Sequence, residues 1–143
     1  MRKLFFLITL IFFLFSLSGQ DGKGDIVVSL KGMKVEGTVY LTLFDKADGF
    51  PSKRKMAITY RLKKVTSKTM KIVFDKVKYG NYAVAVWHDQ NDNKKLDKNW
   101  LGIPNEGFGA SRDAEGKMGP PKFKDAVFKH DKVKNNIVIN VNY

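Results

Sequence analysis

Residues 82–87 read Tyr-Ala-Val-Ala-Val-Trp, a run that is apolar on both faces of an extended chain. Such a run is typical of a central strand that is buried on both sides. On either side of it, shorter runs alternate apolar and polar residues with a period of two, which predicts strands with one buried face. These runs lie at 26–31, 38–44, 58–63, 70–74, 126–129 and 137–142. The chain is therefore expected to be all-β, with about seven strands.

The strands are separated by turns rich in Gly, Asp and Lys, and no segment has the pattern of an amphipathic helix. This favours an antiparallel β-sandwich, with a small closed barrel as the competing architecture. Gly80-Asn81 precedes Tyr82 at the start of the most apolar strand. A Tyr at such a corner often returns its hydroxyl to a nearby backbone group, so we expect a structural role for Tyr82.

The first twenty residues have the pattern of a secretory signal. Arg2 and Lys3 precede an apolar run at 4–15, and small residues follow at Ser16, Ser18 and Gly19. We therefore expect a leader at 1–20, one domain at 21–143, and export to a bacterial periplasm or the medium. The apolar run is too short to span a bilayer comfortably, so no stable membrane insertion is expected after cleavage. Gln20 stands where a lipobox would need Cys, so lipidation is not expected.

The absence of cysteine excludes disulfides, thiolate nucleophiles and thiolate metal sites. Without Arg2 and Lys3 the chain has 24 basic and 14 acidic residues, a net charge of +10. Only three of the basic residues are Arg, and Lys lacks the planar fork that binds phosphate in a bidentate way. We expect no nucleic-acid partner. A solvated lysine-rich face with weak attraction to anionic envelope surfaces is the expectation.

The 34 residues from His88 to Pro121 lack a strand pattern. A loop of this length in a small domain is usually functional or disordered. It contains too many apolar residues for a solvated tether, so we expect it to be ordered and to fold over one face of the sheet. The apolar residues are Trp100, Leu101, Ile103, Phe108 and Met118, and the expected seat is Ala83, Ala85 and Trp87.

This segment begins with the run Asp89-Gln-Asn-Asp-Asn-Lys-Lys-Leu-Asp97. Oxygen-bearing side chains fall at positions 1, 3, 5 and 9 of the run, as in the first three quarters of an EF-hand loop. The predicted calcium ligands are Asp89, Asn91, Asn93, the carbonyl of Lys95, and Asp97.

Two positions depart from that loop, because Lys94 replaces the turn Gly and Trp100 replaces the final bidentate Glu. Glu106 or Asp113 could fold back as the missing carboxylate. The alternative is that the Asp and Asn side chains only cap their own turns.

The predicted binding surface combines rings and carboxylates near this loop. It comprises Trp87, His88, Trp100, Glu106 and Phe108, which would suit a sugar or a peptide because aromatic faces stack and carboxylates accept hydrogen bonds. In the competing interpretation both Trp residues only hold the loop in place.

The favoured function is an exported binding or accessory module, and the alternative is a calcium-stabilised structural envelope protein. A hydrolase that uses His88 with Ser111 and Asp113 is less favoured, because no nucleophile elbow is present.

Several stretches together resemble the bacterial DUF2141 proteins, an exported family of unknown function. The matching stretches are 37–39, 43–45, 49–51, 80–84, 88–93, 96–97, 101–109, 119–121 and 125–128, with Ser111 and Phe123. The family usually has Gly where this chain has Lys94. The resemblance implies a prealbumin-like or immunoglobulin-like sandwich and supplies no activity. It also implies that the loop and the preceding strand form one signature, which makes the loop the expected working surface.

Overall fold

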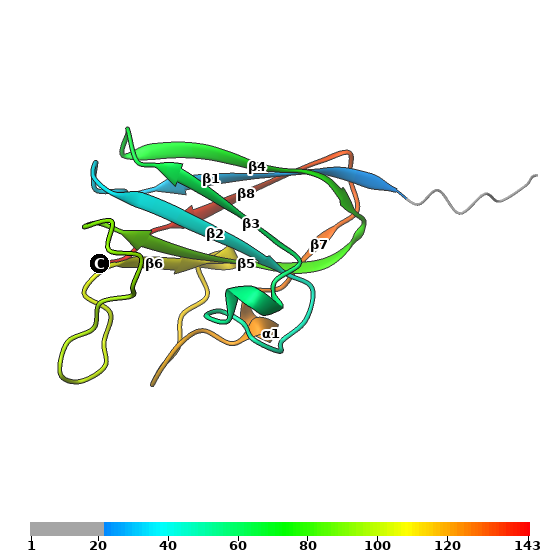
Figure 1. Ribbon diagram of the computed structural model, residues 1–143. Coiled ribbons are helices and arrows are strands. Elements are labelled where there is room, and N and C mark those ends of the chain that lie inside the picture. Colours follow the sequence, from blue (N-terminus) through cyan, green and yellow to red (C-terminus); the bar gives the residue numbers. More distant parts are fainter. Residues whose placement is uncertain (1–21) are drawn as a thin grey trace, which may run out of the picture.

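The computed structural model describes residues 22–143, so the predicted leader at 1–20 lies outside the described residues. Eight strands form two facing sheets, as Figure 1 shows. The strands are β1 (Lys23–Lys31), β2 (Thr38–Phe44), β3 (Thr59–Lys64), β4 (Thr69–Lys78), β5 (Gly80–Asp89), β6 (Gly107–Ala110), β7 (Phe128–His130) and β8 (Lys134–Asn140). Short helical turns are η1 (Arg54–Met56), η2 (Ser111–Asp113) and α1 (Phe123–Ala126).

The strand order is β4-β1-β8 in one sheet and β3-β2-β5-β6 in the other, with β7 also paired to β5. The predicted all-β sandwich is confirmed, and β5 is the central strand that its apolar run predicts. One pairing differs from the expected antiparallel arrangement, because β8 runs parallel to β1. A period of two specifies which face of a strand is buried, but it carries no information about strand direction.

Two predicted boundaries are wrong. The segment 88–121 is not strand-free, because β6 lies within it and pairs with β5. Its sequence, Gly-Phe-Gly-Ala, is too short and too rich in glycine to show a strand pattern. The predicted strand at 126–129 is divided between the end of α1 and β7. The chain therefore has two shorter connections here, at 90–106 and 111–127, in place of one long loop.

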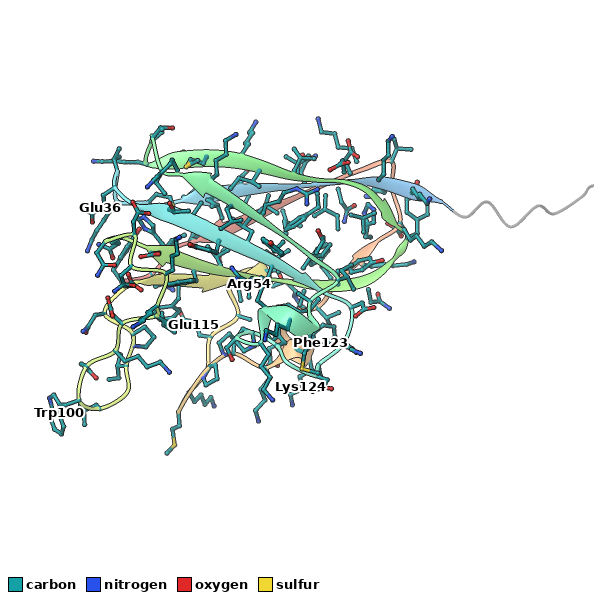
Figure 2. The ribbon with its side chains drawn as sticks, viewed as in Figure 1. Glu36, Arg54, Trp100, Glu115, Phe123 and Lys124 are labelled. Atoms are coloured by element: carbon teal, nitrogen blue, oxygen red, sulfur yellow. The ribbon has the colours of Figure 1, made fainter. Side chains whose placement is uncertain are left out.

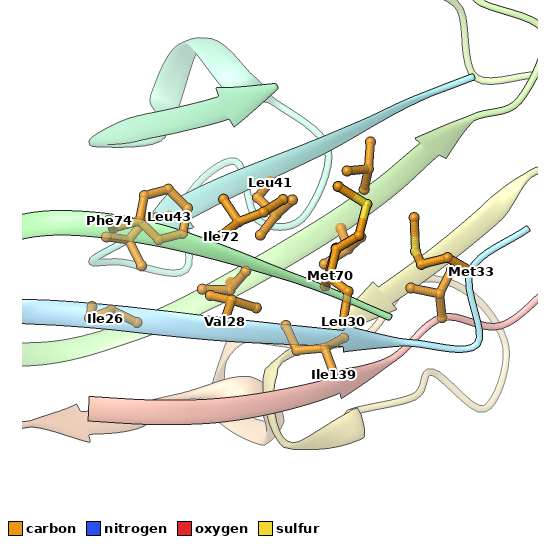
Figure 3. Close-up of a cluster of buried hydrophobic side chains, with 14 of the residues drawn as sticks. Ile26, Val28, Leu30, Met33, Leu41, Leu43, Met70, Ile72, Phe74 and Ile139 are labelled. Carbon is orange, nitrogen blue, oxygen red and sulfur yellow. The ribbon is translucent and has the colours of Figure 1, made fainter. Parts of the chain in front are cut away.

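The core lies between the two sheets, where the inward residues of β1, β2, β4, β5 and β8 meet (Figure 3). Its largest fully buried side chains include Phe74, Ile26, Leu30, Leu41, Leu43 and Ile139. At the corner before β5, the hydroxyl of Tyr82 donates to the carbonyl of Lys78 at 2.9 Å, which confirms its predicted structural role. Burial raises the pKa of this hydroxyl above its ordinary value.

The connection at 111–127 packs against the outer face of β5. Ala83, Ala110 and Ala126 are buried there together, and Phe50 and Phe123 cover them. Of the predicted contact residues Ala83, Ala85 and Trp87, Ala83 is therefore covered, by the connection at 111–127. In the described part of the chain, no helix is long and apolar enough to cross a bilayer.

Candidate functional site: the Asp/Asn loop and the adjacent aromatic face

The segment 89–106, here called the Asp/Asn loop, begins at Asp89, where β5 ends. The carboxylate of Asp89 holds the backbone of this loop. Asp89 is fully buried. One of its oxygens accepts the backbone N–H of Asn93 at 3.1 Å, and the other accepts that of Lys94 at 2.8 Å. Hydrogen bonds to a charged acceptor are among the stronger ones in proteins. Asp89 therefore closes the first turn of the loop.

The next two oxygen-bearing residues converge on one carboxylate. Asn91 and Asn93 each accept the backbone N–H two residues further on, at 3.1 and 2.8 Å. Their amide groups both donate to the same oxygen of Asp97, at 2.8 and 2.7 Å. The Asn side chains thus cap their own turns, and they also converge on Asp97. Side chains at alternate positions of a tight turn face the same centre, which brings positions 3, 5 and 9 together.

Lys94 adopts the backbone conformation that the replaced glycine would adopt. Its φ is +63°, and that of Asp92 is +58°, both in the left-handed region. The tight turn therefore forms in spite of the departure at position 6. A left-handed conformation costs a residue with a Cβ about 1 kcal/mol relative to Gly.

Glu106 ties the two ends of the loop to the sheet. It is almost fully buried. Its Oε1 accepts the backbone N–H of Gln90 at 3.2 Å, and its Oε2 accepts that of Asp97 at 3.3 Å. The same Oε2 accepts the indole N–H of Trp87 at 2.8 Å. Of the two acids considered for the missing carboxylate position, Glu106 is the one at the loop.

Asp113 lies elsewhere. Its two oxygens accept the backbone and side-chain N–H groups of Asn140 in β8, at 2.8 and 2.7 Å. Among residues 22–143, no three His, Cys, Asp or Glu side chains are grouped closely enough to hold a metal ion by themselves. A cation in this loop would therefore need amide and backbone oxygens as well, with the Asn91 and Asn93 amides turned over.

The loop is fastened to the neighbouring strands by Asp92 and Gly37. Asp92 accepts the hydroxyl of Thr38 at 2.6 Å and forms an ion pair with Lys64. Hydrogen bonds from Lys64 and Thr38 hold the pKa of Asp92 below its ordinary value. Gly37, at φ +61°, lies so close to the loop that a Cβ would collide with the carbonyl of Asp89.

Beside the loop, the outer face of the second sheet carries a row of rings, here called the aromatic face: Tyr40, Trp87 and Phe108. Trp87 pairs with Tyr40 on one side and with Phe108 on the other, so all three point to the same face. The rings of Trp87 and Tyr40 stack at 4.5 Å.

Two charged groups contact this face. The guanidinium of Arg54 lies 5.7 Å from the ring centre of Tyr40, within cation–π range, and the carboxylate of Glu106 accepts the indole N–H of Trp87. Burial, together with the nearby negative charge of Asp89, raises the pKa of Tyr40 above its ordinary value. Trp87, Glu106 and Phe108 are therefore brought together as predicted.

His88 is not part of this surface. Its ring is fully buried on the opposite face of β5, because neighbouring strand residues point to opposite sides. Its nitrogens lie 2.6 Å from the hydroxyl of Tyr143 and 2.7 Å from the carbonyl of Glu36. Ser111 is also buried, and its hydroxyl donates to the carbonyl of Ala126 at 2.6 Å. The residues of the less favoured hydrolase arrangement therefore have other partners.

Trp100 lies at the tip of the loop, with 90% of its surface exposed (Figure 2). It is separate from the aromatic face, and the expectation that it holds the loop in place is wrong. Of the two Trp residues, only Trp87 has that role, through its hydrogen bond to Glu106. The sequence interpretation also missed Tyr40 and Arg54 as site residues. A large aromatic ring at an outward position of β2, between Val39 and Leu41, was the available signal.

Comparison with known proteins identifies the family. The model of a family described as an uncharacterised protein conserved in bacteria (DUF2141) matches residues 28–138. The chain belongs to the DUF2141 family. The matched range covers β2 to β7 completely, the last four residues of β1 and the first five of β8, and it includes the whole Asp/Asn loop. No curated protein and no solved structure matched the chain. The DUF2141 match thus confirms the family and leaves the activity open.

Proposed function

We propose that this DUF2141 protein is an exported binding module whose Asp/Asn loop holds Ca²⁺ and thereby fixes the aromatic face for a sugar or peptide ligand. The observation that carries the proposal is the double role of Glu106, which joins the loop backbone to the indole of Trp87. Whatever orders the loop also orders the ring beside it.

The donor set supports calcium. The predicted ligands are Asp89, Asn91, Asn93, the carbonyl of Lys95, and Asp97, and Glu106 supplies the further carboxylate. Hard oxygen donors on a loop suit Ca²⁺ better than the strict octahedron of Mg²⁺. Three basic residues of the segment 94–98 oppose a cation. We therefore expect affinity in the range of extracellular modules, with a dissociation constant of about 0.1–1 mM.

Calcium binding is tested by titration calorimetry and thermal unfolding of EDTA-treated protein. At calcium ten times above its dissociation constant, binding adds about 1.4 kcal/mol to the free energy of unfolding. For a domain of this size, that is a rise of roughly 5 °C in Tm. Asp97→Asn should abolish the rise, whereas Asp131→Asn, in the turn between β7 and β8, should retain it. No heat and no shift in Tm for the unchanged protein would refute the calcium part.

The ligand part is tested on the aromatic face. Neutral hexasaccharides and short peptides are titrated while Trp fluorescence is followed, with calcium present. Trp87→Ala and Phe108→Ala should each weaken binding at least ten-fold, and Trp100→Ala should not. Failure of every probe, or equal effects of all three variants, would contradict a ligand site on this face.

The alternative is a calcium-stabilised structural envelope protein. It is favoured by Asp89, whose two oxygens are already used to hold the loop's own backbone. This alternative predicts the same rise in Tm with calcium and no binding by the aromatic face. The two experiments together therefore separate the candidates.

Export to the periplasm or medium rests on the pattern of residues 1–20. A fusion of residues 1–30 to an alkaline phosphatase that is active only after export tests it. An active fusion is expected, and Leu7→Arg with Leu10→Arg should abolish activity by interrupting the apolar run. An inactive unchanged fusion would overturn the assignment.

A further inference from the structure

The tip of the Asp/Asn loop is an ordered hairpin that presents apolar side chains to solvent. Asn99 holds it: its side-chain oxygen accepts the backbone N–H groups of Leu101 and Ile103, at 2.9 and 3.0 Å. Below it, Lys98 pairs with Pro104, and the N–H of Asn105 donates to the carbonyl of Asp97 at 2.9 Å. The hairpin therefore has a defined shape.

The apolar side chains of this hairpin are unusually exposed. Trp100 is 90% exposed, Leu101 61% and Ile103 53%. Met118, in the connection at 111–127, is fully exposed as well. In Figure 1 the loop at 90–106 and the segment around 118 both extend away from the same side of the sandwich. Several exposed apolar side chains on one side of a domain indicate an interaction site, whereas single scattered ones are common on any protein surface.

Lysines flank these apolar residues along the sequence. Lys94, Lys95 and Lys98 lie on the loop with the tip, and Lys117, Lys122 and Lys124 lie on the second segment. All six side chains are exposed. The same two stretches, 94–103 and 117–124, contain a single acid, Asp97, whose carboxylate faces the loop interior. The two projecting segments thus carry exposed apolar side chains together with six exposed lysines, and the exposed acids next to them in the sequence include Glu115 and Asp125.

We propose that this end, here called the apolar tip (Trp100, Leu101, Ile103 and Met118), inserts into the interfacial layer of a membrane that contains anionic lipids. A projecting hairpin can enter the interfacial layer because lipids rearrange around an inserted group. Trp prefers the level of the lipid headgroups, while Leu, Ile and Met favour the acyl boundary. The six lysines match anionic headgroups, each lysine near the surface contributing about five-fold in affinity. This membrane contact requires neither calcium nor the aromatic face.

Vesicle binding by the chain from residue 22 onward, which contains both sheets, tests the proposal without interference from the leader. Sedimentation with vesicles of 30% phosphatidylglycerol in phosphatidylcholine is expected to show binding that weakens with salt but persists at 0.5 M NaCl. Charge attraction alone would vanish there, because the Debye length falls below the length of the lysine-bearing segments. The emission of Trp100 should shift to the blue and be quenched by lipids brominated near the headgroup.

Trp100→Ser with Leu101→Ser should lower binding at least ten-fold while leaving Tm unchanged, because neither side chain packs against the core. Val133→Ser, which removes a 77% exposed apolar side chain in the turn between β7 and β8, is the matched control and should bind normally. Three results would each overturn the proposal: no vesicle binding at low salt, equal binding by the double variant, or an equal loss with Val133→Ser.

Discussion

Replacement of Glu106 by Gln is the sharpest test of how the loop is held. The side chain is almost fully buried and accepts three N–H groups, from Trp87, Gln90 and Asp97, at 2.8, 3.2 and 3.3 Å. Gln has one acceptor oxygen in place of two. Placed at the position of Oε2, that oxygen retains two of the bonds in neutral form, while the amide NH₂ faces the N–H of Gln90.

The expected cost follows from these contacts. Each retained bond weakens by about 1 kcal/mol when its acceptor loses its charge. A partly buried donor left facing another donor costs about 1–3 kcal/mol. The neutral side chain avoids the cost of burying a charge, which offsets part of this loss. We therefore expect the free energy of unfolding to fall by about 2–4 kcal/mol. The corresponding fall in Tm is roughly 8–16 °C.

Urea unfolding followed by far-UV circular dichroism measures this loss without relying on tryptophan emission. The indole N–H resonance of Trp87 should shift at the same time, since it loses a charged acceptor. Glu115→Gln, an exposed glutamate in the next connection, is the matched control and should change stability by less than about 0.5 kcal/mol. An equally small loss for Glu106→Gln would refute the role assigned to this carboxylate.

Three further predictions concern the loop and its surroundings. Lys94→Gly should raise the free energy of unfolding by about 1 kcal/mol, because φ is +63° there, and a destabilised variant in urea would contradict the assigned turn. Ser111→Ala should lower the free energy of unfolding by about 2 kcal/mol, because the buried hydroxyl accepts the backbone N–H of Val84 and donates to the carbonyl of Ala126. An unchanged stability in calorimetry would refute this. The lowered pKa of Asp92 means that its ion pair stabilises the fold above pH 4 and is lost as pH falls through the lower, folded value. Carboxyl NMR should find that pKa below the ordinary value in the unchanged protein and closer to it in Lys64→Met, where the hydrogen bond from Thr38 remains.

Much of the scaffold could be predicted, because its signals are local. The alternation in β1 to β4 and β8 follows from burial of one face, the apolar run of β5 follows from burial of both faces, and the corner of Tyr82 follows from its place at the start of β5. The two strands that were misplaced or missed, β6 and β7, have four and three residues. Such short strands are specified by the partner they pair with, here β5, rather than by their own pattern.

The candidate site divides in the same way. The spacing of Asp89, Asn91, Asn93 and Asp97 predicted that their side chains would meet, and the contacts on Asp97 agree with it. The prediction that His88 belongs to the binding surface is wrong. Successive side chains of a strand point to opposite faces, so a surface that contains Trp87 and Asp89 cannot also contain His88.

By itself, the amino-acid sequence determined the class of fold, the central strand and the residues of the oxygen-bearing loop, because periodicity and turn chemistry act between neighbours along the chain. Only the tertiary structure decided that Glu106 and not Asp113 reaches the loop, that Tyr40 lies against Trp87, and that Trp100 stands free at a tip. Each of these depends on pairing between segments distant in sequence, where register and packing across two sheets set the distances.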